Sequence, residues 1–260
     1  MIREIVCRRC RWPGMLVLTV ALAAATFAAG ESPYKSVLTE TELAAMVEAD
    51  AKIIADALAK GTPDKKGVSK IRAAALMLAT YAQGAGDSQA GLRDRALRIG
   101  DAANKGQFDE IKKLIPELKP GAAPPDSKTR KPALQEAFDL AELMQQFKPE
   151  RGGGLELEKS LQTAAKKRAA LTANEIKNLI PVLLRIAVIA QPCEAFAPAA
   201  DEGKKTRAQW NKWSQEMGAL ALDAARLAKA PKPDDKALKA VLNKMDANCT
   251  ACHNVFRDSN

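Results

Sequence analysis

The stretch DDKALKAVLNKMDANCTACHNVFR, Asp234–Arg257, lies three residues from the end of this 260-residue chain and decides the fold. Its apolar and cysteine residues recur in steps of one, three or four, which is the period of one helical face. The residues on this face are Leu238, Val241, Leu242, Met245, Cys249, Cys252, His253 and Phe256. The sequence therefore predicts a long amphipathic helix that carries two cysteines and the only histidine of the chain on its apolar side.

The end of this helix has the pattern of a haem-attachment motif. Cys249, Cys252 and His253 occupy positions i, i+3 and i+4, so all three project from one face. Two thiols can add to the two vinyl groups of a haem, and the adjacent imidazole can reach the iron. Because Cys-x-x-Cys-His is the signature of c-type haem attachment, we predict one covalently bound haem c with His253 as an axial iron ligand.

A zinc site and a thioredoxin-like redox pair are the two other uses of such a motif. A structural zinc site needs about four ligands, and the third cysteine available to it, Cys193, lies 56 residues before Cys249. A thioredoxin-like pair opens a helix after a strand, whereas Cys249 and Cys252 lie near the end of a predicted helix. The sequence favours haem over both.

The N-terminus reads as an export signal. A basic start with four arginines is followed by an apolar run, Met15–Ala29, of about 15 residues, which is short for a membrane span. We expect residues 1–30 to be removed by cleavage after Ala28 or Gly30; the alternative is an uncleaved membrane anchor. A cleaved signal predicts a periplasmic protein with no membrane attachment, which agrees with haem attachment outside the cytoplasm.

The remaining cysteines need separate interpretations. Cys7 and Cys10 form another Cys-x-x-Cys, but Arg11 follows them instead of histidine, and they are lost with the signal. Cys193 is expected to be a buried free thiol. The alternative is an intermolecular disulfide, which non-reducing electrophoresis can exclude.

Composition indicates a helical, globular and basic protein. Hydrophobic residues make up 47% of the chain, charged residues 27% and aromatic residues 4%. The abundance of Ala, Leu and Lys with few β-branched residues favours an all-α fold. The formal charge is +9, and removal of residues 1–30, with four Arg and one Glu, lowers it by three. This charge can attract acidic partners, but no aromatic-interleaved basic patch points to nucleic acid.

Helical periodicity divides the chain into two halves. The segment KPGAAPPDSKTRKP, Lys119–Pro132, contains four prolines and interrupts the pattern. We predict a helical bundle without haem over residues 31–120, a linker over 121–132 and a haem domain over 133–260. Residues 155–171 are expected to form another helix or an extended connection. The other predicted helices cover residues 40–60, 68–83, 89–105, 108–118, 133–147, 173–191, 207–229 and 234–257.

The two halves show partial internal similarity. IRAAALMLATYAQ, Ile71–Gln83, aligns with LIPVLLRIAVIAQ, Leu179–Gln191, at matching places in the two halves. DEIKKLIPEL, Asp109–Leu118, and NEIKNLIPVL, Asn174–Leu183, share seven of ten residues at a different offset. Duplication of a four-helix unit and chance similarity of amphipathic helices therefore both remain open.

The second half resembles the class II c-type cytochromes, cytochrome c′ and its low-spin relatives, over about residues 132–257. The matching stretches are LAELMQQF from Leu140, CEAFAPAADEGKKTRAQW from Cys193, and the C-terminal stretch quoted first. The resemblance implies a four-helix bundle with the haem near the C-terminus.

The resemblance also implies roles for individual residues. Cys249 and Cys252 would form the thioether bonds, and His253 would be the proximal ligand. Arg257 would lie near the haem and pair with a propionate. Trp210 would pack in the core near the haem, and Phe256 would touch its edge. Simple core packing of Trp210 is an equally good interpretation.

The sixth iron position distinguishes two functions in this family. A methionine ligand from the first helix of the bundle favours electron transfer, and Met144 is the candidate here. An empty position shielded by apolar side chains binds small gases such as nitric oxide or carbon monoxide. Phe138, Leu140 and Ala141 lie nearer than Met144 to the usual ligand position, so both functions stay open.

We therefore predict an exported monohaem cytochrome that carries electrons between redox partner proteins and is not an enzyme. Gas binding is the alternative. The half without haem is expected to replace a second subunit by packing against the haem bundle, which gives an internal pseudo-dimer. The other possibilities are a homodimer and a partner-binding or spacer domain.

Overall fold

The protein is all-helical over the residues that its structure, a computed structural model, describes. These are residues 38–59, 61–123, 134, 138–149 and 154–257. The expected signal, 1–30, and most of the expected linker, 121–132, lie outside them. Within the described residues no β-strand occurs, and one isolated bridge joins Glu202 to Lys205. The all-α prediction is confirmed.

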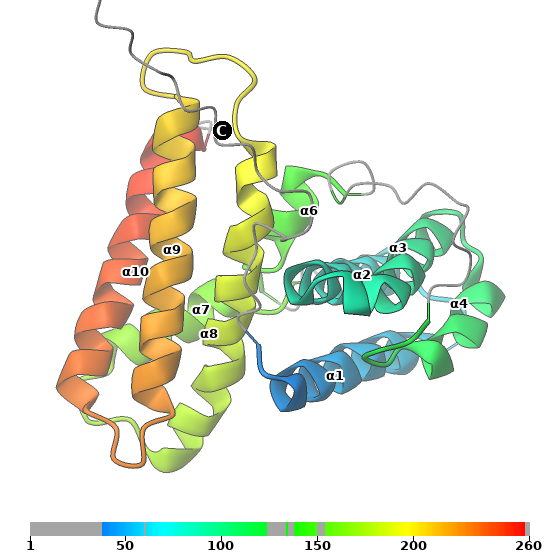
Figure 1. Ribbon diagram of the computed structural model, residues 1–260, viewed down its shortest axis with the longest axis horizontal. Helices are drawn as coiled ribbons and strands as arrows, with labels where there is room; N and C mark the ends of the chain where they lie inside the picture. The colour runs from blue at the N-terminus through cyan, green and yellow to red at the C-terminus, as the bar shows by residue number, and fades with distance from the viewer. Residues whose placement is uncertain (1–37, 60, 124–133, 135–137, 150–153, 258–260) are drawn as a thin grey trace, which may run out of the picture. The chain divides into compact units, whose positions relative to one another are not determined.

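Two sets of helices follow one another along the chain (Figure 1). The first set is α1 (Glu40–Leu58), α2 (Lys65–Ala85), α3 (Ala90–Asn104) and α4 (Phe108–Leu114). The second set is α6 (Leu140–Gln145), α7 (Leu157–Lys166), α8 (Ala173–Cys193), α9 (Arg207–Ala228) and α10 (Asp235–Phe256). The described residues of both sets belong to one compact unit.

Side-chain caps fix where several of these helices begin. The side chains of Thr39 and Thr172 each accept from the backbone N–H three residues later. The carboxylates of Glu42 and Glu175 in turn accept from the threonine backbone N–H groups. Such reciprocal capping boxes satisfy the free donors of the first turn. Asp139 and Glu142 make the same box at α6, so this helix starts at Leu140. The predicted continuous helix over 133–147 is therefore interrupted: Leu134 is helical, Phe138 and Asp139 are not, and α6 begins at Leu140.

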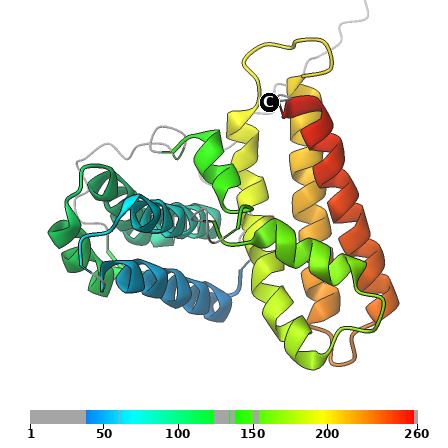
Figure 2. The same ribbon diagram turned by 180° about the vertical axis from the view of Figure 1, so that it is seen from behind.

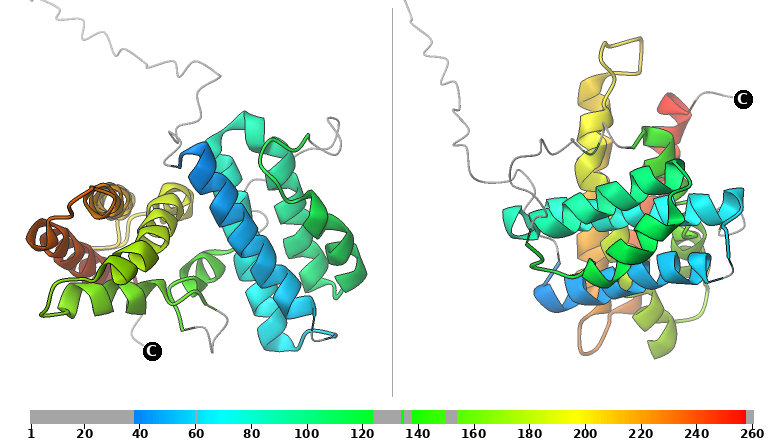
Figure 3. Two further views of the ribbon diagram at one scale, coloured as in Figure 1. Left: turned by 90° about the horizontal axis from the view of Figure 1, so that it is seen from below. Right: turned by 90° about the vertical axis from the view of Figure 1, so that its right-hand side faces the viewer.

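Helices α7 to α10 form the C-terminal bundle. Helices α8 and α10 run in one direction and α9 runs in the other (Figure 1), and Figure 3 shows these three side by side when viewed along their length. Helix α7, predicted as a helix or a connection, crosses α8 and α10 (Figure 2). Gly218 lets α9 approach α8 closely, because a Cβ there would lie 3.2 Å from the Cβ of Ala190.

The two sets of helices share one hydrophobic core. Helix α2 is buried over most of its length, from Ile71 to Ala82, as expected of a helix that is apolar on every side. A buried polar group also joins the sets. Arg185 of α8 donates from Nη2 to Asp50 of α1 at 2.7 Å and from Nε to the hydroxyl of Tyr81 of α2 at 3.0 Å.

The start of α6 is held by the first set of helices. The ring of Phe138 lies against Gly100 of α3, where a Cβ would approach its Cζ to 2.7 Å. The Arg72 guanidinium lies 5.3 Å from the centre of that ring, pairs with Glu142 and donates to the Gly100 carbonyl at 2.8 Å. These contacts fix α6 relative to α2 and α3.

Helix α8 is unusually apolar. Among the described residues, the segment Ala173–Phe196 is long and apolar enough to cross a membrane, with a mean hydropathy of 1.6. However, 56% of its most apolar window is buried inside the protein. In addition, Arg185 in the middle of the helix is paired with buried Asp50. These contacts are those of a core helix.

Candidate haem-attachment site

The site is built on the apolar face of α10. Asp234 caps the helix by accepting from the backbone N–H of Ala237 at 3.0 Å. Leu238, Leu242 and Met245 are fully buried and fix this face against the core. The following positions on the same face, Cys249, Cys252, His253 and Phe256, are only partly buried. The predicted single face is thus present, and its last two turns remain accessible.

Cys249 and Cys252 are both free thiols in surroundings that keep them protonated. Burial raises the pKa of Cys249 to about 12, with smaller contributions from the carboxylates of Glu158 and Asp246. Burial also raises the pKa of Cys252 to about 11. Redox-active Cys-x-x-Cys pairs have lowered pKa values at helix N-termini. The position and the pKa direction here both count against a thioredoxin-like function.

An aromatic cluster of Trp210, Trp213 and Phe256 covers one side of the site. Phe256 meets Trp210 edge to face, with ring centres 4.9 Å apart, and meets Trp213 in the same manner at 5.8 Å. The indole N–H of Trp210 donates to the backbone carbonyl of Cys193 at 2.6 Å. Trp210 therefore ties the start of α9 to the end of α8 beside the last turn of α10.

Cys193 lies at this same end of the bundle as a buried free thiol. Its Sγ donates to the carbonyl of Ile189 at 3.2 Å. Burial raises the pKa of Cys193 to about 12, and the charges of Cys252 and Glu194 add to this effect. Cys193 thus resembles the expected buried thiol and is not a reactive one.

Two predicted site residues lie in less enclosed positions. Met144 is partly buried in α6 and packs against the core beside the fully buried Leu143. Figures 1 and 2 show α6 at the same level along the bundle as the last turns of α10. Arg257 is exposed at the end of α10, and its backbone N–H donates to the carbonyl of His253 at 3.0 Å.

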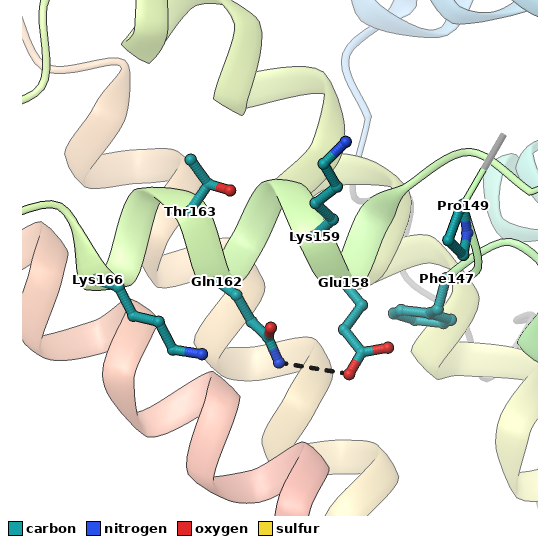
Figure 4. Close-up of a pocket in the computed structure, with 7 residues that line it drawn as sticks. All are labelled: Phe147, Pro149, Glu158, Lys159, Gln162, Thr163 and Lys166. Atoms are coloured by element: carbon teal, nitrogen blue, oxygen red, sulfur yellow. Dashed lines mark hydrogen bonds between the residues drawn. The ribbon is translucent and has the colours of Figure 1, made fainter.

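Sequence reasoning missed the contribution of α7. Glu158 is close enough to affect the pKa of Cys249, and Gln162 donates to Asp246 of α10 at 3.2 Å. No motif marks these residues, although their i, i+4 spacing places them on one face of α7. Beside them is an open hollow of about 430 Å³ (Figure 4). Phe147, Pro149, Glu158, Lys159, Gln162, Thr163 and Lys166 line it.

The donor groups fit a haem better than a bare metal ion. Over the part of the chain that the structure describes, no three His, Cys, Asp or Glu side chains gather in a way that could hold a metal ion. A zinc site is therefore not supported. Two neutral thiols and one imidazole on a partly covered apolar face, next to aromatic side chains, match what a haem needs: two attachment sulfurs, one iron ligand and apolar surroundings.

A helical bundle with such a donor set on its last helix is the arrangement of a haem-binding cytochrome. Residues 155–257 match the family model described as Cytochrome C′. This segment, from just before α7 to the end of α10, is therefore class II cytochrome c-like, as the sequence resemblance indicated. Helices α1–α4 and α6 lie outside the matched residues. No curated protein and no solved structure matches the chain.

Proposed function

We propose that this protein is an exported monohaem c-type cytochrome that carries electrons between redox partners. The observation that carries the proposal is the placement of Cys249, Cys252 and His253 on one partly buried face of α10. When bound there, haem supplies one-electron redox chemistry. The protein acts as an electron carrier and not as an enzyme.

Each residue of the motif has a defined role in this proposal. Cys249 and Cys252 would hold the haem through thioether links, because a thiol can add across a vinyl group without an oxidant or a reductant. His253 would supply the imidazole that holds the iron. Phe256 and Trp210 exclude water from one side of the site, and burial of this kind tunes the reduction potential.

The basic surface is proposed to steer an acidic partner. Lys244 on α10 and Arg257 at its end are exposed, and Arg257 is also the candidate partner of a haem propionate. Attraction between exposed charges is screened by salt. A rate of electron transfer that falls steeply with ionic strength supports such docking, and a rate indifferent to salt contradicts it.

Gas binding at an open sixth position is the second candidate function. The family match begins at residue 155 and does not include Met144. Its description, Cytochrome C′, is that of the relatives with an open sixth position. A sixth ligand from Met144 would instead favour electron transfer.

The absorption spectrum of the purified holoprotein, oxidised and reduced, with and without carbon monoxide, tests both functions. A sharp low-spin reduced spectrum that ignores the gas is expected for an electron carrier with a filled sixth position. In that case Met144→Leu should convert it to a form that binds carbon monoxide, while Met217→Leu on α9 serves as the matched control. A broad high-spin spectrum in the unaltered protein that shifts with the gas contradicts the filled site and favours gas binding.

Export and the role of the first helices complete the proposal. Cleavage after residue 28 or 30 would place the protein in the periplasm, and N-terminal sequencing of the mature protein tests this. Helices α1–α4 are proposed to replace a second subunit, which the contacts of Asp50 and Tyr81 with Arg185 support. Light scattering should then give the mass of a monomer, and the mass of a dimer contradicts this role.

A further inference from the structure

Two polar contacts hold α10 within the turn that precedes Cys249. On one side, Asn248, only 9% exposed, donates from Nδ2 to Oε2 of Glu216 on α9 at 3.1 Å. On the other side, Gln162 of α7 donates from Nε2 to Oδ1 of Asp246 at 3.2 Å. Both contacts join side chains that are distant in sequence, and neither belongs to the haem motif.

The contact on α7 is part of a short hydrogen-bonded row. The same Nε2 of Gln162 also lies 3.4 Å from Oε1 of Glu158, one turn earlier. Figure 4 shows Gln162 and Glu158 directed to the same side of α7 and joined by this bond. One amide thus lies between two carboxylates, one from its own helix and one from α10, which restricts the orientation of Gln162.

The helical period places the two contacts on opposite sides of α10. Successive residues are about 100° apart around a helix, so Asp246 and Asn248 are about 160° apart when measured through the apolar face. Met245 and Cys249 lie between them on this projection. The contacts therefore flank the apolar face at the point where its haem-attachment part begins.

We propose that these two hydrogen bonds, Asn248–Glu216 and Gln162–Asp246, form a polar clamp that sets the rotation of α10 and so the direction of the His253 imidazole. Side chains extend about 5–6 Å from a helix axis, so a rotation of 10° moves them by about 1 Å. Functional groups need to be held within about 0.5 Å. Core packing alone would restrict the rotation of this end of α10 less than core packing with the clamp does, because the cysteines and His253 are only partly buried.

The clamp rests on the proposed haem attachment, so its test has one part with haem and one part without. Glu216→Leu removes the bond to Asn248, and Gln162→Leu removes the bonds to Asp246 and Glu158. Glu216→Gln keeps an acceptor for Asn248 and should restore that bond. The control is Asp235→Ala, which removes the 2.8 Å ion pair with Lys239 and the 3.0 Å bond from the Leu171 backbone N–H at the other end of α10.

In the haem-loaded protein, both leucine variants should change the electron paramagnetic resonance g-values and the circular dichroism of the main haem band. Glu216→Gln and Asp235→Ala should reproduce the unaltered protein. A merely stabilising contact would not shift these haem signals. Leucine variants with unchanged haem spectra would overturn the proposal, even if their stability were lower.

In protein made without haem, amide hydrogen exchange of residues 249–257 should accelerate about tenfold in the leucine variants, the effect of losing a hydrogen bond to a charged group. Exchange in residues 236–242 should stay unchanged. If the unaltered protein takes up no haem but the leucine variants show this local acceleration, the proposed function fails and the clamp stands. Unchanged exchange in 249–257 overturns the clamp.

Discussion

Removing one member of the buried Asp50–Arg185 pair should destabilise the whole helical unit. The side chain of Asp50 is fully buried and that of Arg185 is 14% exposed. Replacing Asp50 by Ala leaves the guanidinium buried with the Tyr81 hydroxyl as a remaining partner. Breaking a buried ion pair in this way costs about 3–5 kcal/mol. We expect a loss of that size in the free energy of unfolding, measured by urea denaturation with circular dichroism.

An exposed ion pair on the same helix supplies the control. Lys52 and Asp56 of α1 are joined at 3.0 Å, but their side chains are 72% and 63% exposed. Such pairs contribute about 0–1 kcal/mol, so Asp56→Ala should change the unfolding free energy little. If Asp50→Ala cost no more than Asp56→Ala, the pair would not hold the two sets of helices together and the reasoning would be refuted.

The reverse variant, Arg185→Met, tests the direction in which the loss of stability changes with pH. Burial raises the pKa of Asp50, and the charge of Arg185 opposes this effect. Without Arg185 the pKa of Asp50 should rise further. A carboxyl whose pKa is higher in the folded state gains stability as pH falls and it becomes protonated. The deficit of Arg185→Met relative to the unaltered protein should therefore shrink between pH 7 and pH 5; a growing deficit contradicts this.

Three further predictions concern single side chains. The Lys167 ammonium and the Thr172 backbone hold the pKa of Glu175 at about 2, so its contribution to stability should be lost as pH falls from about 4.5 toward 2. Glu175→Gln should flatten the pH dependence of the urea midpoint there, and an unchanged slope contradicts the effect. The Cys193 thiol, with its pKa of about 12, should resist iodoacetamide at pH 8 until the protein unfolds. Mass spectrometry measures the labelling, and rapid labelling of the folded protein would contradict the burial of this thiol. Trp210→Phe leaves the Cys193 carbonyl without its 2.6 Å bond and should cost about 1–3 kcal/mol in urea unfolding, whereas a neutral change would mean that water replaces the indole.

The sequence was sufficient to place Cys249, Cys252 and His253 on one helical face, because this arrangement is local. Cys249, Cys252 and His253 lie within five residues, so helical geometry alone places them together. Export and the sixth ligand remain predictions, since residues 1–30 lie outside the described structure and nothing tests Met144. Duplication also remains a prediction, because Ile71–Gln83 lies in α2, the second helix of its set, whereas Leu179–Gln191 lies in α8, the third helix of its set.

Other features depend on contacts that sequence spacing does not contain. The interruption of the predicted helix before Leu140 coincides with the Asp139–Glu142 capping box and with the packing of Phe138 on Gly100. The clamp residues were not recognised, because Gln162 and Asp246 are 84 residues apart and become neighbours only when α7 crosses α10. Polar pairs of this kind carry no periodic signal.

The most direct test of the central claim is the intact mass of the mature protein, purified from cells that attach haem to exported proteins. We expect the mass of the chain plus one haem, retained after acid and organic solvent extraction and lost when Cys249 and Cys252 are both replaced by Ser. The mass of the bare chain, with both cysteines titrating as free thiols, would contradict haem attachment at α10.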